Sequence, residues 1–244
     1  MASFLLIHGA WHGGWCFDRL RRPLEAMGHS TAAPTLPGMG GGARALAGAS
    51  LRSWAGFVVA EAGKLSGPVI LCGHSRGGLV ISQAAEQAPE LFCDLVYISG
   101  ALVPSGKSLY EVIGAGMEGG DFGSALSSVE DGLGIAFAPE RSADIFYNRC
   151  TPEDQAMAAA RLQVEPVRPL GTALELSDAR YGRIPRHYVE CADDQCFPLA
   201  AQRAMQAALP CASVVMLDSD HSPFLCAPQA LAAALDNIAK ERMA

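Results

Sequence analysis

The pentapeptide Gly-His-Ser-Arg-Gly, residues 73–77, directly follows the apolar run 69–72 and precedes a stretch compatible with a helix. Ser75 is therefore predicted to lie at a turn between a strand and a helix. Such a turn strains the serine backbone, and the residues two before and two after the serine must be small to avoid collision. Gly73 and Gly77 meet that requirement. Gly-x-Ser-x-Gly also occurs in ordinary glycine-rich turns, but the strand before it and the helix after it favour an exposed nucleophile at Ser75.

Predicted strands and helices alternate along most of the chain. Apolar runs predict strands at residues 4–7, 30–33, 68–72, 95–98, 187–191 and 214–217. Apolar residues at helical spacing predict helices at residues 15–27, 51–65, 77–87, 199–209 and 228–242. Strands separated by helices of this length are typical of an α/β fold with a mostly parallel sheet and helices on both faces. The glycine-rich segment 37–48 is predicted to be a loop.

This alternation stops between residues 104 and 183, which are richer in glycine and polar residues and contain no clear buried strand. Helices are predicted there at 124–129 and 152–162. An insertion into an α/β fold that carries its nucleophile at a strand's carboxyl end is expected to lie over that site. We therefore expect a core of residues 1–103 and 184–244 with a cap of residues 104–183. The alternative is a loosely packed excursion that makes no contact with the site.

Composition excludes several classes of partner. The 244 residues suffice for one large domain, and 50% of them are hydrophobic, as in a globular protein with a substantial interior. The net charge of −7 argues against nucleic acid, because phosphate binding needs a basic surface. No apolar run reaches the roughly 18 residues that a membrane span needs, so no membrane association is expected.

The chain start and the cysteines predict a cytoplasmic protein. The first residues lack a basic region, and their short apolar run continues into a glycine-containing loop, so we interpret them as the first core strand. The eight cysteines are scattered, with no pair at the spacing of a zinc site. We therefore expect free thiols in a reducing compartment and no metal ion.

A serine nucleophile needs a base, and the sequence contains six histidines. His221 follows the last predicted strand, which gives the chain order of serine, acid and histidine. His74 lies inside the turn beside Ser75 and cannot easily point back at it. The others occupy an early loop or surface-like and strand-edge positions, so His221 is the predicted base.

The acid that orients the imidazole should follow the strand that ends near residue 191. Two adjacent residues, Asp193 and Asp194, lie there. Asp194 is favoured because Pro198 begins a helix four residues later. Asp193 then remains as a solvated loop residue and as the alternative acid.

Hydrolysis by acyl transfer also needs N–H donors for the oxyanion that develops on the substrate. One donor is normally the backbone N–H after the nucleophile, which belongs here to Arg76. The second comes from the loop after an early strand. The loop of residues 8–15 matches that position, and Ala10 N–H is its predicted donor.

The chain resembles the α/β-hydrolase superfamily, in particular the branch of plant methylesterases, α-hydroxynitrile lyases and bacterial carboxylesterases, including pyrethroid-type hydrolases. The resemblance covers nearly the whole chain, and its markers are residues 8–15, 73–78, 180–185 and 220–224 with Asp194, Pro198, Pro228 and Leu231. It implies the α/β-hydrolase fold with an inserted cap and no metal or organic cofactor. It also implies catalytic roles for Ser75, Asp194 and His221, with oxyanion donors at Ala10 and Arg76.

Arg76 departs from the branch, whose members often carry Leu or Met after the nucleophile. Its side chain is expected to form an ion pair with an acidic core or cap residue, and contact with a substrate carboxylate is the alternative. Candidate pocket or lid residues are aromatic, and core packing is an equally good explanation for each: Trp11, Phe122, Phe137, Phe146, Tyr147 and Phe224.

The expected activity is hydrolysis of a small carboxylic ester with a hydrophobic portion; the oligomeric state stays open, a homodimer included. The alternatives are a hydroxynitrile lyase and a non-catalytic small-molecule receptor on the same fold. A complete triad argues against the receptor. Lyases of this branch are expected to carry a lysine directly after the histidine and a threonine in the early loop. Ser222 and Gly9 occupy these positions here, and Gly9 is expected to leave room where the threonine would contact substrate.

Overall fold

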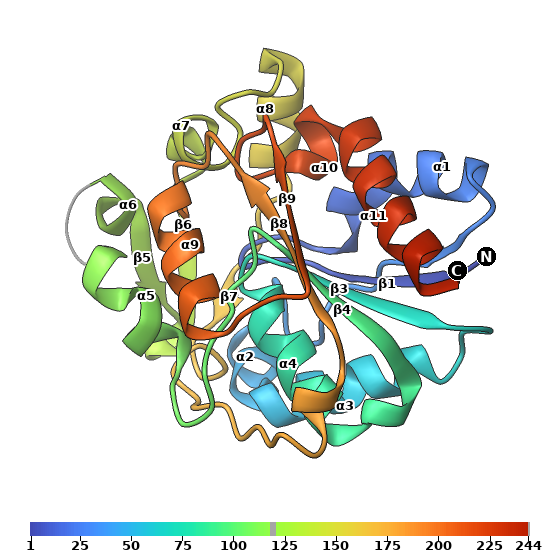
Figure 1. Ribbon diagram of the computed structural model, residues 1–244. Helices are drawn as coiled ribbons and strands as arrows, with labels where there is room; N and C mark the ends of the chain where they lie inside the picture. The colour runs from blue at the N-terminus through green and yellow to red at the C-terminus, as the bar shows by residue number, and fades with distance from the viewer. Residues whose placement is uncertain (118–120, 244) are drawn as a thin grey trace.

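Six parallel strands form the central sheet of the molecule (Figure 1). The computed structural model describes residues 1–117 and 121–243. In sheet order the strands are β2 (Ser30–Ala32), β1 (Ser3–Ile7), β3 (Val69–His74), β4 (Phe92–Ile98), β8 (Arg186–Cys191) and β9 (Ser213–Leu217). Every neighbouring pair in this sheet is parallel, which confirms the predicted α/β class.

Helices cover both faces of this sheet. Helices α1 (Asp18–Ala26) and α11 (Pro228–Met243) pack together on one face, and α3 (Leu51–Ala62) and α4 (Gly77–Gln87) on the other (Figure 1). Further helices are α2 (Ala43–Gly48), α5 (Leu109–Met117), α6 (Asp121–Ser124), α7 (Ser142–Phe146), α8 (Pro152–Ala159), α9 (Leu199–Ala208) and α10 (Pro223–Cys226). Short 3₁₀ helices are η1 (Gly14–Phe17), η2 (Pro89–Leu91), η3 (Glu130–Gly132), η4 (Pro139–Arg141) and η5 (Tyr181–Arg183). Within the described ranges, no helix is long and apolar enough to cross a membrane.

Local sequence accounts for the central elements. All residues of β1 and β3 are buried, as expected of strands covered by helices on both faces. Helix α3 begins with a capping box, in which the Ser50 hydroxyl oxygen accepts a hydrogen bond from Ser53 N–H at 3.1 Å. Helix α4 buries most of its length against β3, β1 and β4.

Residues 104–183 contain a second, three-stranded antiparallel sheet that the sequence did not indicate. Its strands are β5 (Leu126–Val129), β6 (Gly134–Phe137) and β7 (Glu165–Pro166), in that order. The prediction of a helix at 124–129 is therefore wrong, since α6 ends at Ser124 and the strand β5 follows. Six residues are too few for a stable isolated helix, and pairing with β6 satisfies the backbone groups instead.

The glycine-rich segment 37–48 also differs from its prediction as a loop. Its last six residues form α2, whose Leu46 is 1% exposed. The two alanines before Leu46 and the one after it favour a helix, and burial of this leucine holds it against the protein.

The parallel strands bring distant loops together at one edge of the sheet. The last residue of β1 pairs with the second-to-last residue of β3, and the last residues of β3 and β4 and of β8 and β9 are register partners. The loops after these strands carry Ala10, Ser75, Ser99, Asp194 and His221. In an open parallel sheet, ligands bind at the carboxyl ends of the strands, so this edge is the candidate site.

Candidate active site

Ser75 occupies a strained turn between β3 and α4. Its φ of 51° lies in the left-handed region, which non-glycine residues rarely adopt. A Cβ at Gly73 would lie 2.7 Å from the Gly77 backbone, and a Cβ at Gly77 would lie 2.5 Å from the Ile7 carbonyl oxygen. Only glycine fits both positions, which is the requirement predicted from the pentapeptide.

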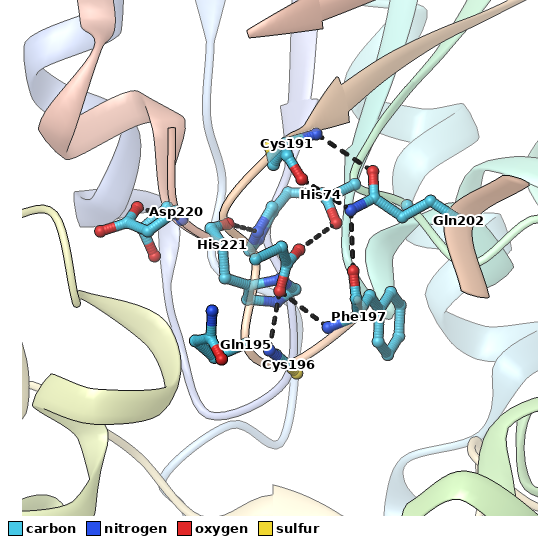
Figure 2. A network of polar contacts seen from close by, with 12 residues as sticks. His74, Cys191, Gln195, Cys196, Phe197, Gln202, Asp220 and His221 are labelled. Atoms are coloured by element: carbon cyan, nitrogen blue, oxygen red, sulfur yellow. Dashed lines mark hydrogen bonds and ion pairs between the residues drawn. The ribbon is translucent and has the colours of Figure 1, made fainter. Parts of the chain in front are cut away.

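His221 and Asp194 form a buried pair beside this turn. His221 Nδ1 donates to Asp194 Oδ2 at 2.7 Å, and both side chains are at most 2% exposed. His74 Nε2 donates to the backbone carbonyl of His221 at 2.7 Å, and the two rings are 4.7 Å apart (Figure 2). His74 therefore holds the loop of His221 against the serine turn instead of acting on Ser75 itself.

Backbone and side-chain donors fix the Asp194 carboxylate. Its Oδ1 accepts from the N–H groups of Cys196 and Phe197, each at 2.7 Å, and its Oδ2 also accepts from the Ser99 hydroxyl. The fully buried Gln202 amide closes this loop by bonding both backbone groups of Cys191 and the Phe197 carbonyl (Figure 2). These hydrogen bonds determine where the carboxylate points.

Sequence reasoning missed Ser99 and Gln202. Ser99 directly follows the predicted strand 95–98, so its place at the carboxyl edge of the sheet was available as an indication. Gln202 lies within a predicted helix, and its inward direction depends on how α9 packs.

The neighbouring Asp193 points away from His221. Its carboxylate contacts Asn148 Nδ2 at 3.1 Å and Arg149 Nη1 at 3.6 Å, and its side chain is 43% exposed. Of the two adjacent aspartates, the structure therefore directs Asp194 to the histidine, as favoured above.

The surroundings of His221 stabilise a proton on its imidazole. Burial by itself lowers the pKa of His221, but the Asp194 charge opposes this, with a smaller contribution from Cys196, so that the pKa lies well above its ordinary value. An imidazole that takes a proton from a serine must carry a positive charge during the reaction. The pair is suited to that task.

A buried ion pair holds the loop that carries Ala10. Arg76 Nη2 donates to the Gly9 carbonyl oxygen at 3.0 Å, and Trp11 N–H donates to Glu165 Oε2 at 3.2 Å. Arg76 and Glu165 pair at 2.8 Å, with both side chains at most 1% exposed. The residues on either side of Ala10 are thus fixed by opposite ends of one ion pair.

The Arg76 side chain is buried and is held by an ion pair and an aromatic ring. Besides Glu165, its guanidinium lies 4.5 Å from the centre of the Trp54 ring. The expected ion pair with a core or cap residue is confirmed, and Glu165, in β7, is the partner that the sequence did not identify. The backbone N–H groups of Ala10 and Arg76 make no hydrogen bond to other residues within the described ranges.

A cavity of about 210 Å³ opens in front of Ser75. Its wall includes Trp11 and Phe122 among the predicted aromatics. The other lining residues are mostly apolar: Ala10, Arg76, Leu109, Tyr110, Ile113, Leu126, Ile135, Leu170, Cys196 and Phe197. A second cavity, of about 400 Å³, shares Ile113, Cys196 and Phe197 with the first. The two cavities are therefore neighbours at these three residues.

The other four predicted aromatics pack behind this wall. Phe137 and Phe146 contact the Trp11 ring, with ring centres 5.2 and 5.8 Å away. Tyr147 bonds His12 Nε2 at 2.7 Å, and the Phe224 ring lies 4.9 Å from the ring of His74. These residues support the loops of the site, as in the core-packing explanation.

Gly9 does not leave the room that was expected there. A Cβ at this position would lie 2.8 Å from Ser75 Cβ and 2.9 Å from His74 Nδ1. The expectation was wrong because the loop after β1 packs its backbone directly on the serine turn. A threonine at position 9 would require one of these elements to move.

Replacing Glu165 with glutamine is expected to cost about 3–5 kcal/mol of unfolding free energy, because the buried Arg76 charge loses its counter-ion. Urea unfolding measures this loss. The Arg76→Met/Glu165→Gln variant should recover most of it, since no lone charge remains. Equal stability of the single variant and the unchanged protein would contradict a charged pair.

Comparison with known sequences decides the family. The alpha/beta hydrolase family profile matches residues 4–234, which is nearly the whole chain. The chain belongs to the alpha/beta hydrolase family. It is 31% identical to a pyrethroid hydrolase of Sphingobium wenxiniae, over 98% of this chain and 88% of that one. It is 30% identical to methylesterase 7 of Arabidopsis thaliana, over 97% and 96% of the two chains.

Some relatives are longer than this chain. The chain spans 64% and 54% of the putative chloroplastic methylesterases 11 and 13 of Arabidopsis thaliana, at 29% identity to each. The solved structure of a pyrethroid hydrolase from Sphingobium faniae superposes with a TM-score of 0.86 at 29% identity, over 98% of both chains. Polyneuridine aldehyde esterase, at 23% identity and a TM-score of 0.86, shares the fold. The chain is thus related to proteins named as esterases.

Proposed function

We propose that this hydrolase cleaves a small carboxylic ester with a hydrophobic portion through an acyl-enzyme on Ser75. The observation that carries the proposal is the buried His221–Asp194 pair beside a strained serine that opens on an apolar cavity. Similarity to esterases supports the same reaction class.

In the first half-reaction, Ser75 Oγ attacks the ester carbonyl carbon while His221 accepts the hydroxyl proton through Nε2. Nδ1 remains bonded to Asp194, which stabilises the imidazolium. The carbonyl oxygen becomes an oxyanion that accepts hydrogen bonds from the backbone N–H groups of Ala10 and Arg76. Collapse of this intermediate breaks the ester C–O bond, and His221 returns the proton to the departing alcohol.

In the second half-reaction, His221 takes a proton from water, and the resulting hydroxide attacks the acyl carbon. The same two N–H groups stabilise the second oxyanion. Its collapse releases the carboxylic acid, and His221 returns the proton to Ser75 Oγ. The chemistry is complete with these side chains and water, so it needs no cofactor.

We assign the role of a cap to residues 104–183, which supply much of the cavity wall, including Leu109, Phe122 and Leu170. The wall offers apolar surface, and the Arg76 charge is occupied by Glu165. A neutral, hydrophobic acyl or alcohol group fits these surroundings better than a charged one.

The eight unpaired cysteines support the expected reducing, cytoplasmic location.

An assay on paired substrates tests the reaction class. The purified hydrolase should hydrolyse p-nitrophenyl or aryl esters and release no cyanide from mandelonitrile above the rate of the Ser75→Ala variant. Ser222, directly after the histidine, carries no charge that could stabilise a departing cyanide ion. The backbone at Gly9 is too crowded for the threonine of a lyase. Cyanide release without ester hydrolysis would refute the esterase and favour the lyase. Saturable binding of a small molecule without turnover of either substrate would favour the receptor.

A further inference from the structure

Two cysteines that are distant in the sequence lie beside the loop of His221. Cys150 lies between α7 and α8, and Cys226 is the last residue of α10. Cys150 Sγ is 3.5 Å from Asp220 Oδ2, and Cys226 Sγ is 3.1 Å from Asp220 Oδ1. The fold thus assembles a cluster of two thiols and one carboxyl group, which we call the Cys150 cluster.

The spacing of these donor atoms is that of a thiophilic metal site. One ligand atom from each of Cys150, Asp220 and Cys226 lies within 4.8 Å of the others. A tetrahedral zinc ion, with bonds of about 2.3 Å to sulfur and about 2.1 Å to oxygen, separates its ligands by about 3.6–3.8 Å. The sulfur–oxygen distances of 3.1 and 3.5 Å are close to this separation. Small side-chain movements would bring all three donors into bonding range.

The Asp220 carboxyl group is positioned in advance and lacks a basic partner. It is fully buried, and it accepts hydrogen bonds from the N–H groups of Arg149 at 2.9 Å and Ser222 at 2.8 Å. The Arg149 guanidinium turns instead to Asp193 and Asp218. Among the residues that the structure describes, no basic side chain pairs with Asp220. A buried carboxylate without a counter-ion is costly, and a divalent cation would supply the missing charge.

The cluster can be reached from solvent. Cys150 and Cys226 are half-buried and line a cavity of about 480 Å³. Three arginines also line it, and two of them are paired with carboxylates, Arg19 with Asp154 and Arg149 with Asp218. The cavity provides an entry path and space for water as a fourth ligand.

We propose that the Cys150 cluster binds one thiophilic divalent cation, Zn²⁺ or Cd²⁺, through both sulfurs and the Asp220 carboxylate, with water as the fourth ligand. Each thiol releases its proton to solvent as it binds the metal, so the affinity rises with pH. The bound ion joins residues 104–183, through Cys150, to the loop before His221 and to α10. It stabilises the folded chain and takes no part in ester hydrolysis.

Titration of the chelator-treated full chain with Cd²⁺ tests this site. We expect one Cd²⁺ per chain, an ultraviolet cadmium–thiolate charge-transfer band and a higher Tm. Bound Cd²⁺ should also protect Cys150 and Cys226 from iodoacetamide in peptide mass spectra, while Cys93 and Cys211 keep their reactivity. Absence of a stoichiometric Cd²⁺ complex in the unchanged protein would overturn the proposal.

Variants locate the ion. Loss of an outer-shell partner lowers the affinity of a metal site by about 10–100-fold. Cys150→Ser and Cys226→Ser each remove a direct ligand, so each should weaken Cd²⁺ binding by at least that factor. Cys211→Ser should leave the Cd²⁺ affinity unchanged. Loss of binding in Cys196→Ser instead would place the ion at the candidate active site and contradict the Cys150 cluster. Thiol protection in the unchanged chain keeps the test decisive if a variant does not fold.

Discussion

Replacing Ser75 with alanine is expected to lower kcat for ester hydrolysis about 10³-fold or more, because no other group in the mechanism can form the acyl-enzyme. Steady-state kinetics with a p-nitrophenyl ester measures the loss. Ser75 is 6% exposed and already has its strained φ with a side chain present, so the fold should be retained in the alanine variant.

A serine-reactive phosphonate gives an independent measurement. It should add its mass to the peptide that contains Ser75 and to no other peptide. Ser105→Ala is a suitable control, since this exposed serine bonds the Leu176 carbonyl away from the site. Full activity in Ser75→Ala, or labelling at another serine, would refute the mechanism.

Asp194→Asn is expected to reduce kcat by about 10⁴-fold, because an amide in place of the carboxylate favours the wrong imidazole tautomer and removes the charge that stabilises the imidazolium. Asp193→Asn is the matched control, since it removes the same charge one residue away. Its carboxylate faces Asn148 and Arg149, so kcat should stay nearly unchanged. The reverse pattern would reassign the acid.

The pH profile separates this role from a purely structural one. Asp194 raises the pKa of His221, so replacing it with asparagine lowers that pKa. The unprotonated base then persists to lower pH. The acidic limb of kcat/KM should therefore move to lower pH in Asp194→Asn, even as the maximum falls. An unmoved limb would mean that Asp194 does not control the proton on His221.

Much of the candidate site could be predicted because its main features are local. The serine turn depends on glycines two positions away, and steric crowding of the backbone imposes that requirement wherever such a turn forms. The places of Ala10, Asp194 and His221 follow from short apolar strands, since residues after parallel strands converge at one edge of the sheet.

Other features depend on which side chains meet across the fold. The difference between Asp194 and Asp193 is one of direction, and it is decided by the donors that each carboxylate finds. The strand β5 forms because β6 offers it backbone partners, which outweigh a weak local preference for a helix.

By itself, the sequence determined the α/β class, the strained serine turn and the order of the candidate catalytic residues, because these follow from periodicity and steric limits over a few neighbouring residues. Only the tertiary structure decided that Arg76 pairs with Glu165, that Gln202 closes the acid loop, and that Cys150 meets Cys226 at Asp220. These contacts join residues far apart in the chain. Their formation depends on packing and on the need to pair buried charges and polar groups, which no local pattern encodes.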